Sequence, residues 1–145
     1  MSAKRNWVTL REFAKRLLAD EAAAGKRAGV NSPAAFRTWE RVRLPLGRMM
    51  GNAGLYSLFS RALALAGGEV SWLRALHVKA DGSLAGLKEL EEKLNIDEIA
   101  RGEIVLVERL LDLLVTLIGP ALTLRLAQDV WPEANFDGLD FGKGG

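Results

Sequence analysis

The chain is poor in side chains that could catalyse a reaction. It has no Cys and a single His, His77, so a nucleophilic mechanism would need a Ser or Thr hydroxyl with His77 as its base. His77 lies among apolar neighbours, and no Gly-x-Ser-x-Gly motif occurs in the sequence. A lone His beside an apolar face is more often a packing residue. We therefore expect no catalytic residue, and an enzyme ranks third among the functions considered, because an all-α domain can carry a site without a sequence motif.

Metal and cofactor sites also lack their usual ligands. Glu108 and Asp112 are four residues apart and would share one face of a helix, but the Glu-x-x-His motif of di-metal helical bundles is missing. An exposed polar strip, or an ion pair with Arg101 or Arg125, explains these two carboxylates more simply. The sequence contains neither a P-loop nor the Gly-rich motif of dinucleotide-binding folds. We expect no metal and no cofactor.

Basic residues are concentrated in the first part of the chain. Residues 1–61 hold 12 Lys and Arg against 4 Asp and Glu, a balance of +8, whereas residues 62–145 hold 8 against 14, a balance of −6. This split could attract a polyanion or let two copies meet head to tail, or the two halves could neutralise each other within the fold. The candidate polyanion-binding residues are Arg11, Lys15, Arg37, Arg41, Arg43 and Arg48. They make nucleic-acid binding the alternative function, although a basic patch alone does not read bases.

The C-terminal segment carries the candidate partner-docking residues. Phe136, Leu139 and Phe141 are interspersed with Asp137 and Asp140 in a Gly-rich stretch. Acidic residues between large apolar ones keep a docking peptide in solution until it meets a groove. The same Phe residues could instead fold back over the helices. Both interpretations are open.

The four Trp residues lie beside apolar stripes, which is typical of core anchors. Trp7 and Trp131 are at the outer edges of the helical part and could instead be exposed interaction residues.

The elements that position these residues are almost all helical, and no convincing strand pattern occurs. The pair Thr9 and Glu12 predicts a capping box, with a helix from about Leu10 to Gly25. A second helix starts at Ser32-Pro33, with Ser as the N-cap, and should end before Pro45. A Gly-rich stretch then follows over residues 44–54, which we interpret as a helical turn and a tight loop.

Further helices are expected over residues 55–66, 69–78, 84–94, 103–118 and 121–130. Residues 103–118 are apolar on most of the helical circumference, which predicts a central core helix. In the last helix, Leu122, Leu126 and Val130 are expected to point inward. The predicted fold is therefore all-α, a single compact bundle of five to seven helices over residues 1–132, with a loose, acidic, Gly-rich tail over residues 133–145.

Composition sets the limits on function. With 145 residues, 49% of them hydrophobic, the chain is long enough for one domain and too apolar to be disordered. No uncharged stretch reaches the roughly 20 residues that span a bilayer, so we expect no membrane insertion and a cytoplasmic location. The leading hypothesis is a non-enzymatic helical interaction module, an adaptor, regulatory or small subunit that binds a protein partner or forms a homo-oligomer.

Overall fold

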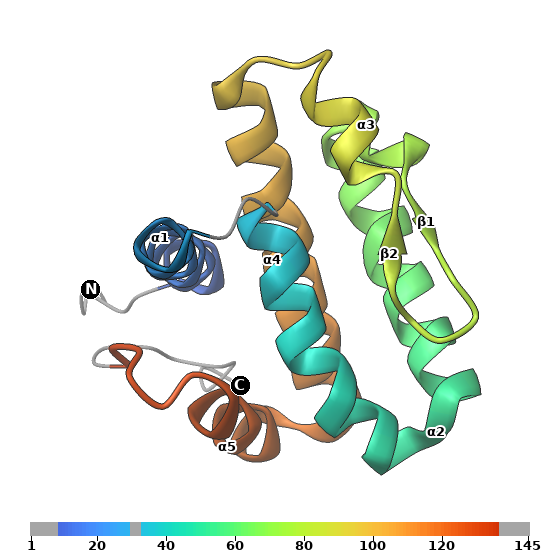
Figure 1. The fold of residues 1–145 in the computed structure, drawn as a ribbon. Helices are drawn as coiled ribbons and strands as arrows, with labels where there is room; N and C mark the ends of the chain where they lie inside the picture. The colour runs from blue at the N-terminus through green and yellow to red at the C-terminus, as the bar shows by residue number, and fades with distance from the viewer. Residues whose placement is uncertain (1–8, 30–32, 137–145) are drawn as a thin grey trace, which may run out of the picture.

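The computed structural model describes residues 9–29 and 33–136, and this part of the chain is an all-α helical bundle (Figure 1). Its elements, in chain order, are α1 (Leu10–Ala28), α2 (Ala34–Glu69), the 3-10 helix η1 (Ser71–Ala75), β1 (His77–Val78), β2 (Leu84–Ala85), α3 (Leu87–Glu91), α4 (Ile96–Ile118) and α5 (Pro120–Val130). The predicted fold class is thus confirmed.

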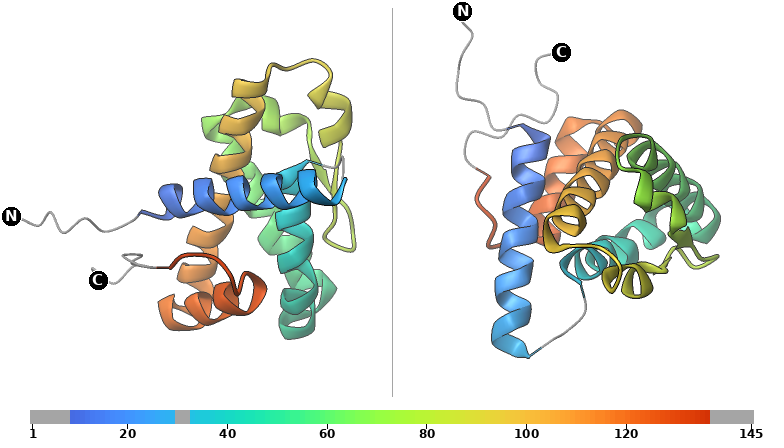
Figure 2. Two further views of the ribbon diagram at one scale, coloured as in Figure 1. Left: turned by 60° about the vertical axis from the view of Figure 1, so that its left-hand side comes forward. Right: turned by 90° about the horizontal axis from the view of Figure 1, so that it is seen from above.

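The central position belongs to α4, as predicted for residues 103–118. It packs against α1, α2 and α5, and α1 and α5 both lie across it on the same side (Figures 1 and 2). Its fully buried residues are Gly102, Val105, Leu106, Val107, Leu110, Leu111 and Leu114. The burial extends around most of the helix, because α4 packs against helices on several sides.

The start of α4 is earlier than predicted. Asn95 accepts a hydrogen bond from the backbone N–H of Glu98, and Glu98 returns one to the backbone of Asn95, which is a complete capping box. Helix α4 therefore gains almost two turns before Glu103. Gly102 lies in this added part, where a Cβ would overlap the ring of Trp72.

Helix α1 begins as predicted and ends later. The Thr9 hydroxyl accepts a hydrogen bond from the backbone N–H of Glu12 at 3.0 Å. The helix continues through Gly25 to Ala28, and Gly29, with φ of 72°, is the C-cap. A positive φ favours Gly. The prediction that a Gly ends this helix was therefore correct, but that residue is Gly29 rather than Gly25.

Helix α2 does not end before Pro45, which corrects the sequence prediction. The helix starts at Ala34, with Pro33 as its N-cap, and Pro45 lies inside it. Val42 and Leu46, on either side of Pro45, are both almost completely buried, so packing holds this turn helical despite the missing N–H. The break comes at Gly51, whose φ of 74° and ψ of 170° let α2 turn back on itself at the bottom of Figure 1.

A small hairpin replaces much of the helix expected over residues 69–78. Only Ser71–Ala75 is helical, in 3-10 form, and His77–Val78 then pairs with Leu84–Ala85 in an antiparallel hairpin that the periodicity did not reveal. The predicted turn Asp81-Gly82-Ser83 joins the two strands. The indole N–H of Trp39 donates to the carbonyl of Gly82 at 2.8 Å, so a buried core residue holds the hairpin. The helix expected over residues 84–94 is limited to α3.

In the last helix, Leu126 and Val130 pack against the core as predicted, although they are only partly buried, and the prediction is wrong for Leu122. Thr123 and Ala127 are its buried residues, whereas Leu122 is largely exposed and Leu126 and Val130 are only half-buried. Gly119 and Pro120 turn the chain so that α5 lies across α4, and the residues of α5 that this crossing buries most completely are the small Thr123 and Ala127. None of the described helices is long and apolar enough to cross a membrane.

Candidate functional site

An open cleft of about 450 Å³ lies between α1 and the segment that follows α5. One wall is a face of α1, and it includes Leu17, Asp20, Glu21 and Arg27. Residues 130–134 form the other wall. Arg41 of α2 completes the lining. We call this hollow the α1–α5 cleft. Its volume is within the range of small-ligand sites, roughly 300–1,000 Å³.

A buried carboxylate organises one side of the α1–α5 cleft. Glu21 is only 6% exposed. Its two oxygens accept hydrogen bonds from Nε of Arg41 at 2.6 Å and from Nε of Arg37 at 3.3 Å. A carboxylate that is buried without partners strongly destabilises a protein. The burial of Glu21 therefore requires the two guanidinium groups beside it. We call these three residues the Glu21 cluster.

The Glu21 cluster depends on a close approach between α1 and α2. Nη2 of Arg37 donates to the backbone carbonyl of Glu21 at 2.7 Å. The guanidinium of Arg37 lies against Gly25, where an added Cβ would overlap it. The physical role of Gly25 is therefore clearance for Arg37, rather than the helix end that the sequence suggested.

Trp131 also lines the α1–α5 cleft, and it is 8% exposed. This excludes the interpretation of Trp131 as an exposed interaction residue, whereas Trp7 lies outside the described residues. The indole N–H of Trp131 has no hydrogen-bond acceptor among residues 9–29 and 33–136. A buried donor without a partner costs about 1–3 kcal/mol and calls for an explanation. No sequence signal could have identified it, because it depends on how the chain returns to α1 after α5.

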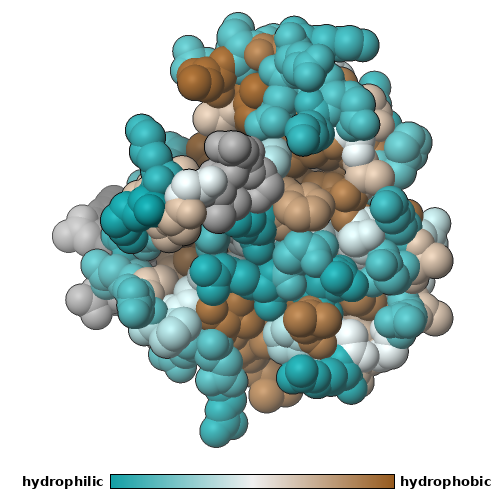
Figure 3. Space-filling view, viewed as in Figure 1, coloured by the Kyte–Doolittle hydropathy of each residue, from teal (hydrophilic) through white to brown (hydrophobic). Residues whose placement is uncertain are grey.

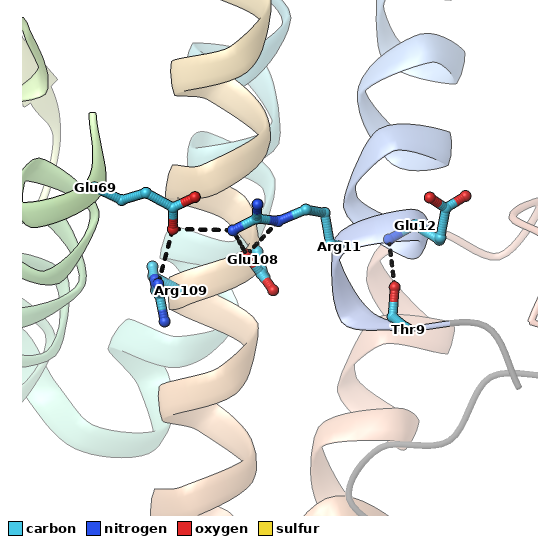
Figure 4. A network of polar contacts seen from close by, with 6 residues as sticks. All are labelled: Thr9, Arg11, Glu12, Glu69, Glu108 and Arg109. Atoms are coloured by element: carbon cyan, nitrogen blue, oxygen red, sulfur yellow. Dashed lines mark hydrogen bonds and ion pairs between the residues drawn. The ribbon is translucent and has the colours of Figure 1, made fainter.

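Among the six candidate polyanion-binding residues, Arg11 is the most strongly paired (Figure 4). It donates from Nε and Nη2 to Oε1 of Glu108, at 2.9 and 2.6 Å, and from Nη2 to Oε1 of Glu69 at 3.0 Å. Nη2 of Arg109 also donates to this oxygen of Glu69, at 2.8 Å. The partner of Glu108 is thus Arg11, in place of the Arg101 or Arg125 expected from the sequence.

These contacts change the acidity of the groups involved. Hydrogen bonds from Arg11 and then from Arg109 lower the pKa of Glu69, and the bonds to Glu69 and Glu108 raise the pKa of Arg11. The ion pairs of Arg11 join the basic first half of the chain to the acidic second half. They connect α1 with the end of α2 and with α4.

The other candidates are spread over α1 and α2. Arg37 and Arg41 belong to the Glu21 cluster. Lys15 is paired with Glu12 at 3.5 Å, and Arg43 with Glu40 at 2.7 Å. Arg48 is exposed and forms no ion pair with any residue that the structure describes. Five of the six basic side chains therefore each have a carboxylate partner within the chain.

The described part of the C-terminal segment folds back onto α1. The half-buried ring of Phe136 lies 5.1 Å, centre to centre, from the buried ring of Phe13. Nη1 of Arg16 donates to the carbonyl of Asn135 at 3.2 Å. The other two candidate docking residues, Leu139 and Phe141, lie outside the described residues.

The remaining polar candidates are not brought together. His77 is exposed on β1, rather than packed beside an apolar face. Asp112 is exposed, whereas its helical neighbour Glu108 is bonded to Arg11. Within residues 9–29 and 33–136, no group of three His, Asp or Glu side chains could hold a metal ion.

Leucine side chains are left uncovered where α4 passes into α5. Leu117 on α4 is 59% exposed and Leu122 on α5 is 48% exposed. Leu113 and Leu126, one helical turn from each of them, are only half-buried. We call these four residues the α4–α5 corner. Figure 3 shows apolar residues on the surface at the lower end of the molecule, where Figure 1 places both this turn and the kink of α2.

Comparison of the chain with protein-family models, with curated proteins and with solved structures found no match. The proposals below therefore depend on the geometry of this chain alone.

Proposed function

We propose that this protein is a non-enzymatic helical interaction module, an adaptor, regulatory or small subunit that binds a protein partner or a second copy of itself. The observation that carries this proposal is the α4–α5 corner. Leu117 and Leu122 are about half exposed, although burying a Leu side chain stabilises a protein by roughly 1.5–3 kcal/mol. Scattered exposed Leu residues are ordinary, but two exposed and two half-buried Leu side chains at two consecutive helical ends favour a binding surface.

The packing of α5 supports the same proposal. This helix has Leu at positions 122, 124 and 126, yet the residues it buries are Thr123 and Ala127. An amphipathic helix normally turns its largest apolar residues to the core. In α5, Leu124 and Leu126 pack against the core but are only partly buried, and Leu122 is 48% exposed, so a second helix could cover them further.

The corner is tested by measuring molar mass with size-exclusion chromatography and light scattering. We expect the wild type to be a dimer or larger, or to enter a complex when mixed with cell extract and cross-linked. Changing Leu117→Glu and Leu122→Glu together should abolish that assembly and leave the circular dichroism spectrum unchanged. Leu65→Glu is the matched control, because Leu65 is 43% exposed on α2, outside the corner. Assembly that survives the double change, or a wild type that stays monomeric and forms no complex, would overturn the proposal.

The alternative function, nucleic-acid binding by the basic N-terminal third, has less support. Arg11, Arg37, Arg41 and Arg43 each donate hydrogen bonds to carboxylates. A phosphate would have to compete with those carboxylates for the guanidinium groups. The chromatography above also distinguishes this function, because bound nucleic acid would add ultraviolet absorbance that disappears at high salt. The proposal includes a cytoplasmic location, which imaging of a fluorescent fusion would test.

A further inference from the structure

We propose that two copies of this chain pair through α5 about a two-fold axis, with Arg125 of each copy opposite Asp129 of the other. The partner of the α4–α5 corner is then a second copy of the chain, so this inference rests on the proposed function. The exposed face of α5 and the two opposite charges on that face carry it.

Helix α5 has a covered side and an open side. Among the helices and strands that the structure describes, α4 is the only one that α5 contacts extensively. The open side carries residues at positions i, i+3, i+4 and i+7, which share one face of a helix. We call this set the α5 outer face: Leu122, Arg125, Leu126 and Asp129. Leu122 is 48% exposed and Leu126 is half-buried, so both have apolar surface left to cover.

The two charges of the α5 outer face are opposite and have no ion-pair partner in the described part of the chain. Arg125 and Asp129 are both exposed and lie one helical turn apart. Asp129 is also in the last turn of α5, which holds no basic residue. Because the C-terminal end of a helix is negative, a carboxylate there is unfavourable, and a guanidinium from another molecule would relieve it.

A face with one charge of each sign is complementary to a copy of itself. In a two-fold dimer, a contact between residue i of one copy and residue j of the other occurs twice. Two antiparallel α5 helices that place Arg125 opposite Asp129 therefore form two such ion pairs, and they bring Leu126 of one copy beside Leu126 of the other. A partner surface with charges of a single sign would instead repel one of the two residues.

Charge reversal tests this pairing. Arg125→Glu leaves the α5 outer face with two negative charges, and Asp129→Arg leaves it with two positive charges. Each single change should weaken dimerisation about tenfold, because two attractive pairs become repulsive, whereas the two changes together should dimerise like the wild type. The matched control is Arg61→Glu, which should also dimerise like the wild type. Arg61 is exposed on α2 and forms no ion pair with any described residue.

An equimolar mixture of Arg125→Glu and Asp129→Arg is the deciding sample. Their outer faces carry opposite charges, so the mixed dimer should exceed the half share that random exchange gives, as counted by native mass spectrometry. An ion pair between Arg125 and Asp129 within one helix would also survive the double change. It would give the mixture no preference, so the mixture separates the two arrangements.

Cross-linking covers the case in which a charge reversal impairs folding. The chain has no Cys, so Leu126→Cys introduces a single thiol beside the two-fold axis and leaves both charges in place. A short bismaleimide should link two copies of this variant efficiently. Leu65→Cys, on α2, is the matched control and should give little linked dimer.

The proposal is wrong if the wild type stays monomeric at about 0.5 mM, if the two charge-reversal variants show no preference for each other, or if Leu126→Cys links no better than Leu65→Cys. The proposed function fails separately. A monomer that binds a different protein, and loses it on changing Leu117→Glu and Leu122→Glu together, would overturn only the pairing of two copies.

Discussion

Glu103 of α4 accepts a hydrogen bond from the backbone N–H of Ala35, in the first turn of α2, at 3.4 Å. Helix α2 has no side-chain cap from its own N-cap residue, Pro33, so a carboxylate from another helix takes that place. Burial raises the pKa of Glu103 to about 7, and nearby Glu91 also raises it, whereas the bond from Ala35 and the charge of Arg37 lower it. The carboxyl group of this partly buried interhelical contact therefore titrates near neutral pH.

The first prediction concerns stability and pH. Because the folded chain binds the Glu103 proton more tightly than the unfolded chain, the stabilisation from this group is complete below the usual pKa of 4.5 and is lost as the pH rises through about 7. Glu103→Gln stays neutral at every pH. We expect it to be more stable than the wild type by on the order of 2–3 kcal/mol at about pH 8, with little difference near pH 4.5.

Urea unfolding followed by circular dichroism across this pH range measures the difference. Glu12→Gln is the control, because Glu12 is 58% exposed, and its profile should run parallel to that of the wild type. Parallel profiles for Glu103→Gln as well would contradict the prediction.

The second prediction concerns the contacts of Arg11 with Glu69 and Glu108. Arg11→Gln should lower the free energy of unfolding by about 1 kcal/mol at neutral pH, a modest value because the side chain is partly exposed and salt screens the pairs. The pKa of Glu69 is lowered, so this stabilisation is present above its usual pKa and is lost as the pH falls through the folded value.

The comparison variant for that measurement is Lys15→Gln. Its pair with Glu12 is exposed on a single helix and should contribute no more than about 0.5 kcal/mol. Equal losses in the two variants, or a loss for Arg11→Gln that is unchanged in acid, would show that the Arg11 network does not connect the helices as described.

The third prediction compares two glycines inside helices. A Cβ on Gly102 would overlap the ring of Trp72, whose N–H donates to the carbonyl of Glu98 at 3.0 Å. Gly102→Ala should therefore destabilise the protein by about 1–3 kcal/mol. Gly68→Ala meets nothing within 4 Å and should stabilise α2 by roughly 0.5–1 kcal/mol. Thermal unfolding of both variants decides the matter, and a gain in stability for Gly102→Ala would exclude the close packing of Trp72.

The fourth prediction tests the continuity of α2 through Pro45. If the helix passes through this residue, Pro45→Ala restores an N–H donor and removes a steric conflict, and it should raise stability by about 1–3 kcal/mol. Pro120→Ala is the matched control, because Pro120 is at the first position of α5, where its missing N–H has no cost. A Pro45→Ala variant with unchanged or lower stability would favour a helix that ends before Pro45.

Local patterns in the sequence were sufficient where neighbouring residues decide the structure. The Thr9 cap, the turn at Asp81-Gly82-Ser83 and the apolar circumference of α4 each involve residues only a few positions apart, and each is confirmed. The all-α class follows from the same short-range periodicity. The Asn95 capping box had the same kind of local signal, although the predicted start at Glu103 missed it.

The rest was decided by contacts between residues distant in the chain. Gly25 lies inside α1, where its missing side chain leaves room for Arg37, and Pro45 remains helical because Val42 and Leu46 are buried around it. The orientation of α5 leaves Leu122 exposed, and Trp131, after α5, lines the α1–α5 cleft together with α1. Composition and periodicity show which residues are apolar or charged, but a partner for Glu21, Glu103 or Arg11 exists only once the helices are packed.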